Sequence, residues 1–299
     1  MADEPRTSLR SLAQLGVQLG VPRLYAKCES ESPTGTQKDR VAGGLVRAAV
    51  AGGAPGITVG TCGNLGVAIS YASRAHGLAC EVFVPASYHH TRADEMAALG
   101  ARVVAVGACY EDAVEASQAH ARARGLFDAN PVGRGGEIAI LEYGAIIDEL
   151  VVQCPARLGS IWVPVGNGTC AAGIHTGLQR HGIAARVCVV GSAGNTALTA
   201  SLAAGRVVEL DPAALRETTT NEPLVNWRSL HVLEAMEAVQ RTSGFAHDAT
   251  DAELIAARDR LLAAAQQPAT PSGAAGLAGL QAFVAALDPA QAHVVILTA

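Results

Sequence analysis

The stretch Gly56-Ile-Thr-Val-Gly60-Thr-Cys-Gly-Asn64 begins a pattern that repeats along the whole chain. Its apolar run from Gly56 to Gly60 predicts a short buried strand. Thr61-Cys-Gly-Asn64 then supplies residues that favour turns and helix caps, and an apolar helical pattern follows to about His76. A buried strand that leads directly into a helix is half of a βαβ unit. The stretch therefore predicts a parallel sheet covered by helices.

Alternating strands and helices continue from this stretch towards the C-terminus. In the first series we predict strands at 80–85 and 102–106 and helices at 92–99 and 110–124. A Gly/Pro-rich connection, 130–136, precedes a second series. There we predict strands at 160–165, 187–190 and 293–297, and helices near 137–153, 170–180, 195–204, 230–241, 251–265 and 272–287. Residues 205–228 are polar and irregular. The fold class is thus α/β.

Composition excludes several classes of protein. The chain has 299 residues, enough for one large or two medium domains. Apolar residues make up 49% of it and charged residues 16%, a composition that excludes general disorder. Aromatic residues at 4% and a net charge of −5 disfavour binding to nucleic acid or to an anionic membrane. No apolar run reaches the ~18 residues of a membrane-spanning helix.

Cysteine usage points to a reducing compartment. The seven cysteines are scattered, without a C-x-x-C pair, which predicts buried thiols instead of a disulfide framework or a metal site. The N-terminus lacks the basic and apolar regions of a signal peptide. We therefore expect a cytoplasmic protein without a metal.

Lysine is rare in this chain. Only Lys27 and Lys38 occur, against twenty arginines, and Lys38 lies in the Pro/Gly-containing stretch Glu31-Ser-Pro-Thr-Gly-Thr-Gln-Lys-Asp-Arg40. A desolvated lysine can lose its proton near neutral pH and attack a carbonyl, which arginine cannot do. The alternative is that Lys38 is an ordinary solvated loop charge.

Two loops that follow predicted strands carry anion-binding chemistry. Gly166-Asn-Gly-Thr-Cys170 opens a helix, where backbone N–H groups favour a phosphate. It lacks the lysine of an ATP-binding P-loop and the spacing of a dinucleotide site, so a phosphate monoester fits better. Thr61-Cys-Gly-Asn64 could bind a carboxylate in the same way. Either loop also fits a plain connection, a tight βα turn at 166–170 or an N-cap turn at 61–64.

Three segments together resemble one enzyme family. They are Pro33-Thr-Gly-Thr-Gln-Lys-Asp-Arg40, Thr61-Cys-Gly-Asn-Leu-Gly66 and Pro164-Val-Gly-Asn-Gly-Thr-Cys-Ala-Ala-Gly173. Their order and chemistry resemble fold-type II (β-family) pyridoxal-phosphate enzymes, whose architecture is that of the tryptophan synthase β chain. The nearest resemblance is to threonine synthase and its relatives, which the segments 225–230, 243–246 and 270–275 extend.

The resemblance implies roles for individual residues. Lys38 matches the lysine that forms the Schiff base with the cofactor and moves protons at Cα and Cβ. The cofactor phosphate would be held by Gly166, Asn167, Gly168, Thr169 and Cys170. Asn64 would bond the 3′-oxygen of the pyridine ring, and the substrate carboxylate would be bound by Thr61, Cys62, Gly63 and Asn64.

A hydroxyl faces the pyridine nitrogen in this family, and Thr298 is its match, with Ser272 as the alternative. A neutral partner leaves the ring unprotonated, which favours elimination or replacement over transamination. Two features depart from the family pattern: Cys62 stands where serine or threonine is usual, and a substrate phosphate would need further cations. Candidates for these are Arg40, Arg92, Arg134 and the His89–His90 pair.

The predicted function is elimination or replacement at Cβ or Cγ of an amino acid, of the threonine synthase type. Alternatives are a β-replacement synthase of the cysteine, cysteate or diaminopropionate type, a serine/threonine ammonia-lyase, and a non-catalytic relative that binds the cofactor. The resemblance also implies a homodimer and two open-sheet domains. The small domain would be 43–135, and the large one 1–42 plus 136–299.

Overall fold

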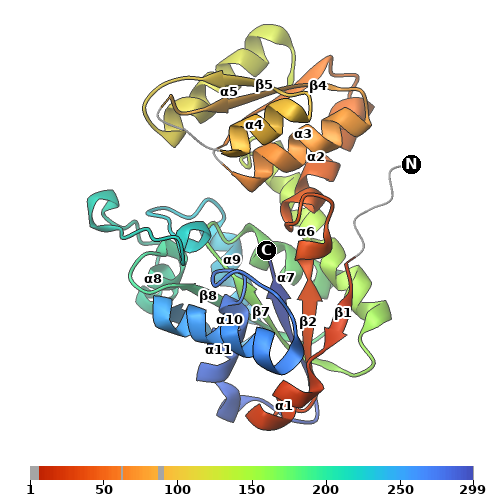
Figure 1. Cartoon of the computed structure of the whole chain (residues 1–299), viewed down its shortest axis with the longest axis vertical. Coiled ribbons are helices and arrows are strands. Elements are labelled where there is room, and N and C mark those ends of the chain that lie inside the picture. The colour runs from red at the N-terminus through yellow and green to blue at the C-terminus, as the bar shows by residue number, and fades with distance from the viewer. Residues whose placement is uncertain (1–6, 62, 87–90, 299) are drawn as a thin grey trace. The chain divides into compact units, whose positions relative to one another are not determined.

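The chain folds into two compact units, each built around its own sheet (Figure 1). The structure is a computed structural model, and it describes residues 7–61, 63–86 and 91–298. Cys62, His89 and His90 therefore lie outside the described residues. The first unit comprises 32–142, and the second comprises 7–31 together with 143–299.

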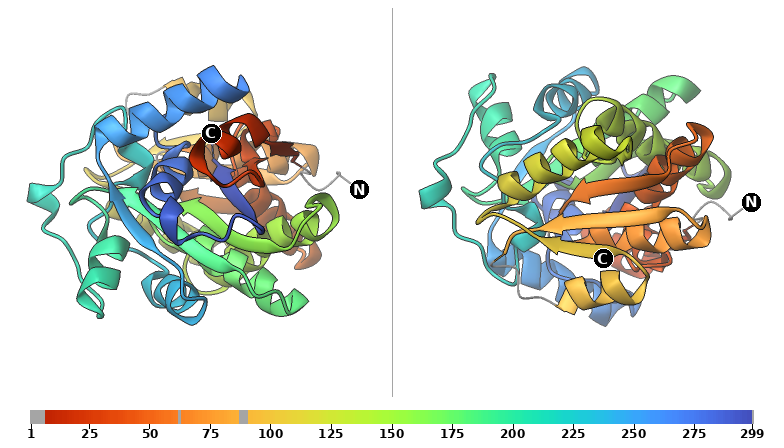
Figure 2. Two further views of the ribbon diagram at one scale, coloured as in Figure 1. Left: turned by 90° about the horizontal axis from the view of Figure 1, so that it is seen from below. Right: turned by 90° about the horizontal axis from the view of Figure 1, so that it is seen from above.

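The first unit contains a four-stranded sheet in which all strands are parallel. The strand order is β5 (Arg102–Ala105), β4 (Ala79–Val84), β3 (Gly56–Gly60) and β6 (Phe127–Asp128). The strands lie side by side in the right-hand view of Figure 2. The helices are α2 (Lys38–Ala51), α3 (Asn64–Ala75), α4 (Thr91–Ala98) and α5 (Tyr110–Arg124), and α6 (Arg134–Gln153) contains the boundary to the second unit.

The carboxyl end of β3 is held by a buried amide. Asn130 accepts a hydrogen bond from Gly60 N–H (3.0 Å) and donates one to Ser117 Oγ of α5 (2.9 Å). A Cβ on Gly60 would lie 2.5 Å from Val114 Cα, so only glycine allows α5 to pack this closely on β3. The end of β3, where the predicted carboxylate loop begins, is therefore rigidly placed within the first unit.

The second unit contains a six-stranded sheet in the order β1-β2-β10-β7-β8-β9. Only β1 runs antiparallel to its neighbour. The strands are β1 (Leu9–Ser11), β2 (Leu24–Cys28), β7 (Leu158–Pro164), β8 (Arg186–Ser192), β9 (Ala246–Ala249) and β10 (Ala292–Leu297). The helices are α1 (Ala13–Leu19), α7 (Thr169–His181), α8 (Ala197–Ala204), α9 (Val232–Arg241), α10 (Asp251–Ala265) and α11 (Ala275–Ala282). The described residues of this unit also form the 3₁₀ turns η1 (Glu29–Glu31), η2 (Pro212–Ala214), η3 (Glu222–Leu224) and η4 (Val284–Ala286).

Trp162 of β7 is the centre of the core beneath α11, which lies in front of the sheet in Figure 1. Its ring is fully buried and stacks near Phe245 (centroids 6.1 Å apart), and its Nε1 donates to Ser160 Oγ (2.8 Å). A Cβ on Gly276 would lie 2.8 Å from the Trp162 carbonyl oxygen. This close approach of α11 fixes β7, and with it the loop that follows β7.

The α/β fold class is confirmed, and the predicted helix at 110–124 has the bounds of α5. The predicted helix at 272–287 is split into α11 and η4. The N-terminal elements and β9 were not predicted. The domain bounds stay a prediction: the contacts group 32–42 and 136–142 with the four-stranded sheet, whereas the sequence-based division assigned them to the large domain.

Candidate active site

Lys38 is the first residue of α2, directly after the turn 32–37. Gly35 adopts φ +82°, and its N–H donates to Ser32 O (2.8 Å), which closes the turn. The backbone N–H of Lys38 donates to Thr36 Oγ1 (3.2 Å). The lysine of the Pro/Gly-containing stretch is thus half-buried and held at the beginning of a helix.

Asp39 joins the turn to the helix. Its Oδ2 accepts hydrogen bonds from Thr34 N–H (3.1 Å) and Thr34 Oγ1 (2.8 Å). Burial raises the pKa of the Asp39 carboxyl, and the bonds from Thr34 oppose that rise. The pairing fixes the backbone on both sides of Lys38.

The other lysine is committed to structure. Lys27 of β2 is fully buried and forms an ion pair with Glu149 of α6. It also donates to Thr7 O (2.6 Å) and Gln153 Oε1 (2.8 Å). The chain has two lysines, so Lys38 remains the candidate to which the sequence-based hypothesis assigns the Schiff base.

The loop from Thr61 to Asn64 ends in α3. Thr61 is buried and its Oγ1 accepts a hydrogen bond from Gly63 N–H (3.4 Å), while Gly63 O accepts one from Gly66 N–H (3.0 Å). Asn64 is the first residue of α3, and Arg92 of α4 donates to its Oδ1 (2.6 Å). The predicted carboxylate loop therefore lies at a helix N-terminus.

Lys38 and Asn64 lie at the same end of the first unit. Helix α2 packs against α3, and it ends at Ala51, shortly before β3 begins at Gly56. A helix of this length spans roughly 20 Å, so its first residue lies at the opposite edge of the sheet, where β3 ends and α3 begins. The predicted Schiff-base lysine and the predicted ring-oxygen ligand thus lie at the same edge of the four-stranded sheet.

The segment Gly166–Cys170 connects β7 to α7. Gly168 adopts φ +81°, and a Cβ there would lie 2.7 Å from Ala235 Cβ, so both conformation and space require glycine. Ala172 N–H donates to Gly168 O (3.0 Å), which leaves the N–H groups before it directed out of the helix end. Thr169 and Cys170 are almost completely buried. Such a donor set suits a phosphate.

A second segment, 226–231, is hydrogen-bonded to the 166–170 loop, the predicted phosphate loop. Ser229 Oγ donates to Gly166 O (2.9 Å), His231 N–H donates to Asn167 O (3.0 Å), and Asn226 Nδ2 donates to Asn167 Oδ1 (3.2 Å). The His231 ring lies 2.8 Å from Thr169 Oγ1. Sequence reasoning assigned no role to these residues, because a contact between positions so far apart leaves no local pattern.

Thr298 follows β10 at the carboxyl edge of the second sheet. Val295 of β10 lies opposite Trp162 of β7, and the strands are parallel, so Thr298 reaches the level of Val165, next to the phosphate loop. Ser272 lies before α11, is buried, and its Oγ is 3.4 Å from Thr270 Oγ1. The geometry places Thr298 beside the loop, at the edge where α/β sheets bind ligands.

Comparison with known proteins identifies the family. The family described as pyridoxal-phosphate dependent enzyme matches residues 2–299. The chain belongs to this family. The resemblance found in the three segments is thereby confirmed, and pyridoxal 5′-phosphate is the cofactor.

Individual relatives differ in activity. The chain is 24% identical over 291 residues to a threonine synthase of Methanosarcina acetivorans, covering 94% of this chain and 70% of the relative. It is 25% identical over 280 residues to a biosynthetic L-threonine dehydratase of Pasteurella multocida, covering 93% of this chain but 52% of the relative. The solved structure of maize serine racemase has the same fold, with a TM-score of 0.82, 20% identity and coverage of 98% of this chain and 88% of that one. The chain spans about half the length of the dehydratase.

The residues present fit the cofactor in each unit taken by itself. The second unit contains a buried threonine hydroxyl at a helix N-terminus, groups that suit a phosphate, and the first contains the Lys38 amine, which suits a Schiff base. Ser32 Oγ and Gln37 Oε1, close to Lys38 along the chain, are buried without a hydrogen-bond partner among the described residues. Polar atoms in this state are rare unless a ligand or water satisfies them.

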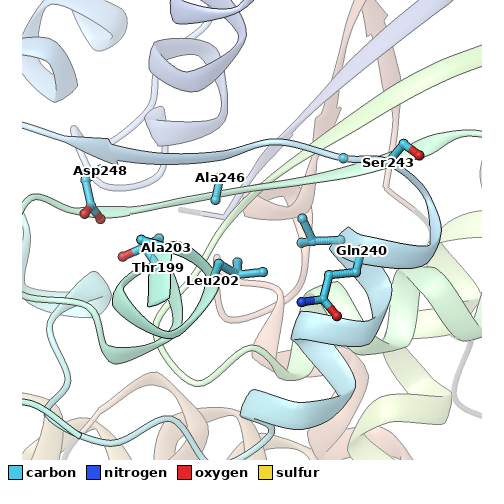
Figure 3. Close-up of a pocket in the computed structure, with 9 residues that line it drawn as sticks. Thr199, Leu202, Ala203, Gln240, Ser243, Ala246 and Asp248 are labelled. Atoms are coloured by element: carbon cyan, nitrogen blue, oxygen red, sulfur yellow. The ribbon is translucent and has the colours of Figure 1, made fainter. Parts of the chain in front are cut away.

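A cavity of about 430 Å³ lies elsewhere, between α8, α9 and β9 (Figure 3). Its lining includes Thr199, Gln240 and Asp248, and it is built from none of the loops described above. Within the described ranges, no helix has the length and apolar character needed to cross a membrane.

Proposed function

We propose that this chain catalyses elimination or replacement of a leaving group at Cβ or Cγ of an amino acid, in a reaction of the threonine synthase type. The observation that carries the proposal is Lys38, which stands at the start of α2 in a chain that matches the family from end to end. Similarity to a threonine synthase over 94% of the chain supports the reaction type. An amine is what a Schiff base with the cofactor requires, and turnover then distinguishes an enzyme from a relative that only binds the cofactor.

Each residue has a stated role in this proposal. When bound to the amine of a substrate, pyridoxal phosphate draws electrons from Cα and makes its proton acidic. Lys38 takes that proton and returns one after the leaving group departs. The N–H groups and hydroxyl of the 61–64 loop hold the substrate carboxylate, and Asn64 donates to the ring oxygen. Cys62 belongs to this loop in the sequence-based hypothesis.

The lysine assignment is tested by reducing the reconstituted protein with borohydride and digesting it. Reduction fixes the cofactor on the lysine to which it is bound, and mass spectrometry identifies the peptide. We expect the cofactor mass on Lys38, and a visible absorbance band that Lys38→Ala removes. Lys27→Met is the matched control, because it removes the other lysine and should keep the band. A cofactor found on Lys27, or no band in the wild type, would sink the proposal.

The reaction type is tested with O-phosphohomoserine. Release of phosphate with formation of threonine would support threonine synthase chemistry. A specific observation favours a second candidate: the similarity to a threonine dehydratase makes ammonia-lyase activity on threonine or serine the next hypothesis. Formation of a 2-oxo acid from L-threonine would support it. Exchange of the acetyl group of O-acetylserine for sulfide would indicate a β-replacement synthase, and a visible band without any turnover would indicate a non-catalytic relative.

We also propose that the protein works as a homodimer in the cytoplasm. Support for the compartment comes from free thiols at Cys28, Cys80, Cys109, Cys154, Cys170 and Cys188. Light scattering of the purified protein would measure its mass in solution. A monomer at micromolar concentration would contradict the dimer.

A further inference from the structure

His231 contacts the phosphate loop through Thr169. The distance from His231 Nδ1 to Thr169 Oγ1 is 2.8 Å, a good hydrogen bond. Both side chains are more than nine-tenths buried, with 7% and 9% exposure. A bond shielded in this way is held in one geometry, so it determines where the Thr169 hydroxyl can direct its hydrogen.

The backbone around His231 keeps the ring in register with the loop. His231 N–H donates to Asn167 O (3.0 Å). The backbone of Gly168 also lies close to His231, since a Cβ on Gly168 would be only 3.0 Å from His231 O. Ala235 N–H donates to His231 O (3.0 Å), which starts α9. The histidine is therefore anchored to the loop and to α9 together.

The effect of the His231–Thr169 contact depends on which of the two groups donates the hydrogen. A threonine hydroxyl has one hydrogen and two lone pairs. If Thr169 donates to His231, no hydroxyl hydrogen remains for a phosphate, whose charged oxygens can only accept. If the ring donates from Nδ1–H, the Thr169 hydrogen stays available for the phosphate.

We propose that His231 is a positioning residue that donates from Nδ1–H to Thr169 and thereby directs the Thr169 hydroxyl to the cofactor phosphate. This rests on the proposed function and on the sequence-based expectation that the 166–170 loop holds the cofactor phosphate. His231 does not touch the phosphate in this account. Its effect on the phosphate is exerted through Thr169.

The test compares the dissociation constants of pyridoxal phosphate and of pyridoxal, which lacks the phosphate. His231→Leu should weaken binding of pyridoxal phosphate about 10- to 100-fold, since hydrogen bonds to charged groups are the stronger ones, and should leave pyridoxal binding unchanged. His231→Asn keeps an N–H close to the Nδ1 position and should restore most of the affinity. The ³¹P NMR signal of bound cofactor should move in His231→Leu and return in His231→Asn.

Thr169→Val gives an independent reading of the same contact. Because His231 acts through Thr169, adding His231→Leu to Thr169→Val should cause no further loss. His181→Asn, on the surface beside Asp148, is the control for removal of a histidine. If His231→Leu does not fold, His231→Gln replaces it, because its longer side chain carries the amide away from the Nδ1 position.

Three results would overturn the inference alone: equal weakening of both ligands, no weakening of either, or no rescue by asparagine. If the wild-type protein binds pyridoxal phosphate no better than pyridoxal, the assignment of the cofactor phosphate to this loop is wrong. Wild-type protein that binds neither would overturn the proposed function as well.

Discussion

Arg92 of α4 donates a hydrogen bond to the side-chain oxygen of Asn64, the first residue of α3, over 2.6 Å. The other nitrogen of the guanidinium donates to Glu95 (2.5 Å), so Arg92 is held from its own helix. With its oxygen occupied, the Asn64 amide presents its NH₂ group as the donor for a ligand. A donor is what an anionic ring oxygen requires.

The first prediction concerns this pair. Arg92→Met should release the Asn64 amide and weaken binding of pyridoxal phosphate by about 3- to 10-fold, the effect of one ordinary hydrogen bond. Both Arg92→Met and Asn64→Ala should shift the visible absorbance band, and the two shifts should have the same direction. Arg102→Met removes an exposed arginine from the same unit and serves as control. Unchanged affinity and spectrum in Arg92→Met would show that Asn64 is positioned without it.

The second prediction concerns the buried ion pair of Lys27 and Glu149. Glu149→Leu would leave a fully buried ammonium without its carboxylate, which should lower the free energy of unfolding by about 3–5 kcal/mol. Adding Lys27→Met removes the charge and should recover most of that loss. Urea denaturation measures both, and Arg180→Ala, which breaks an exposed pair with Asp148, should cost less than about 1 kcal/mol. A double variant no more stable than Glu149→Leu would contradict this account.

This ion pair also explains why β2 escaped prediction. Leu24-Tyr-Ala-Lys-Cys28 reads as an apolar run interrupted by a charge, and its partner Glu149 lies far along the chain. Helix α2 contains Gly43 and Gly44, which lower helix propensity, although a Cβ on Gly44 would meet Glu142 at 2.4 Å. Tertiary contacts determine both elements. Strands such as β7, which is buried throughout and mostly apolar, were predictable because burial on both faces leaves a local signal.

The residues of the candidate site also fall into those that the sequence predicts and those that only the structure reveals. Lys38 and the 166–170 loop were found because glycine, lysine and threonine in fixed order carry chemistry that a sequence displays. Arg92 was considered only as a cation for a substrate phosphate, and its bond to Asn64 needed the structure. His231 gave no signal, since nothing in its neighbours along the chain points to Thr169.

The third prediction concerns pH and Asp39. Because burial raises its pKa above 3.8 in the folded chain, the unfolded chain releases the proton first as the pH rises. The folded state then binds more protons, so the contribution of Asp39 to stability falls as the pH rises from 3.8 through the raised pKa, and does not change below or above that window. Asp39→Asn should remove this slope while its amide oxygen still accepts from Thr34. Denaturation of both proteins across acidic pH measures the difference, and parallel curves would refute the assignment.

The last prediction separates the two hydroxyls that could face the pyridine nitrogen. Thr298 lies beside the phosphate loop at the end of β10, whereas the Ser272 hydroxyl lies 3.4 Å from that of Thr270. Thr298→Ala should therefore weaken binding of pyridoxal phosphate about 2- to 10-fold and shift its absorbance, and Thr298→Ser should restore both. Ser272→Ala should change neither by more than about twofold. A larger effect at Ser272 would transfer the role to that residue, because only the hydroxyl that meets the ring nitrogen can alter the electronic state of the ring.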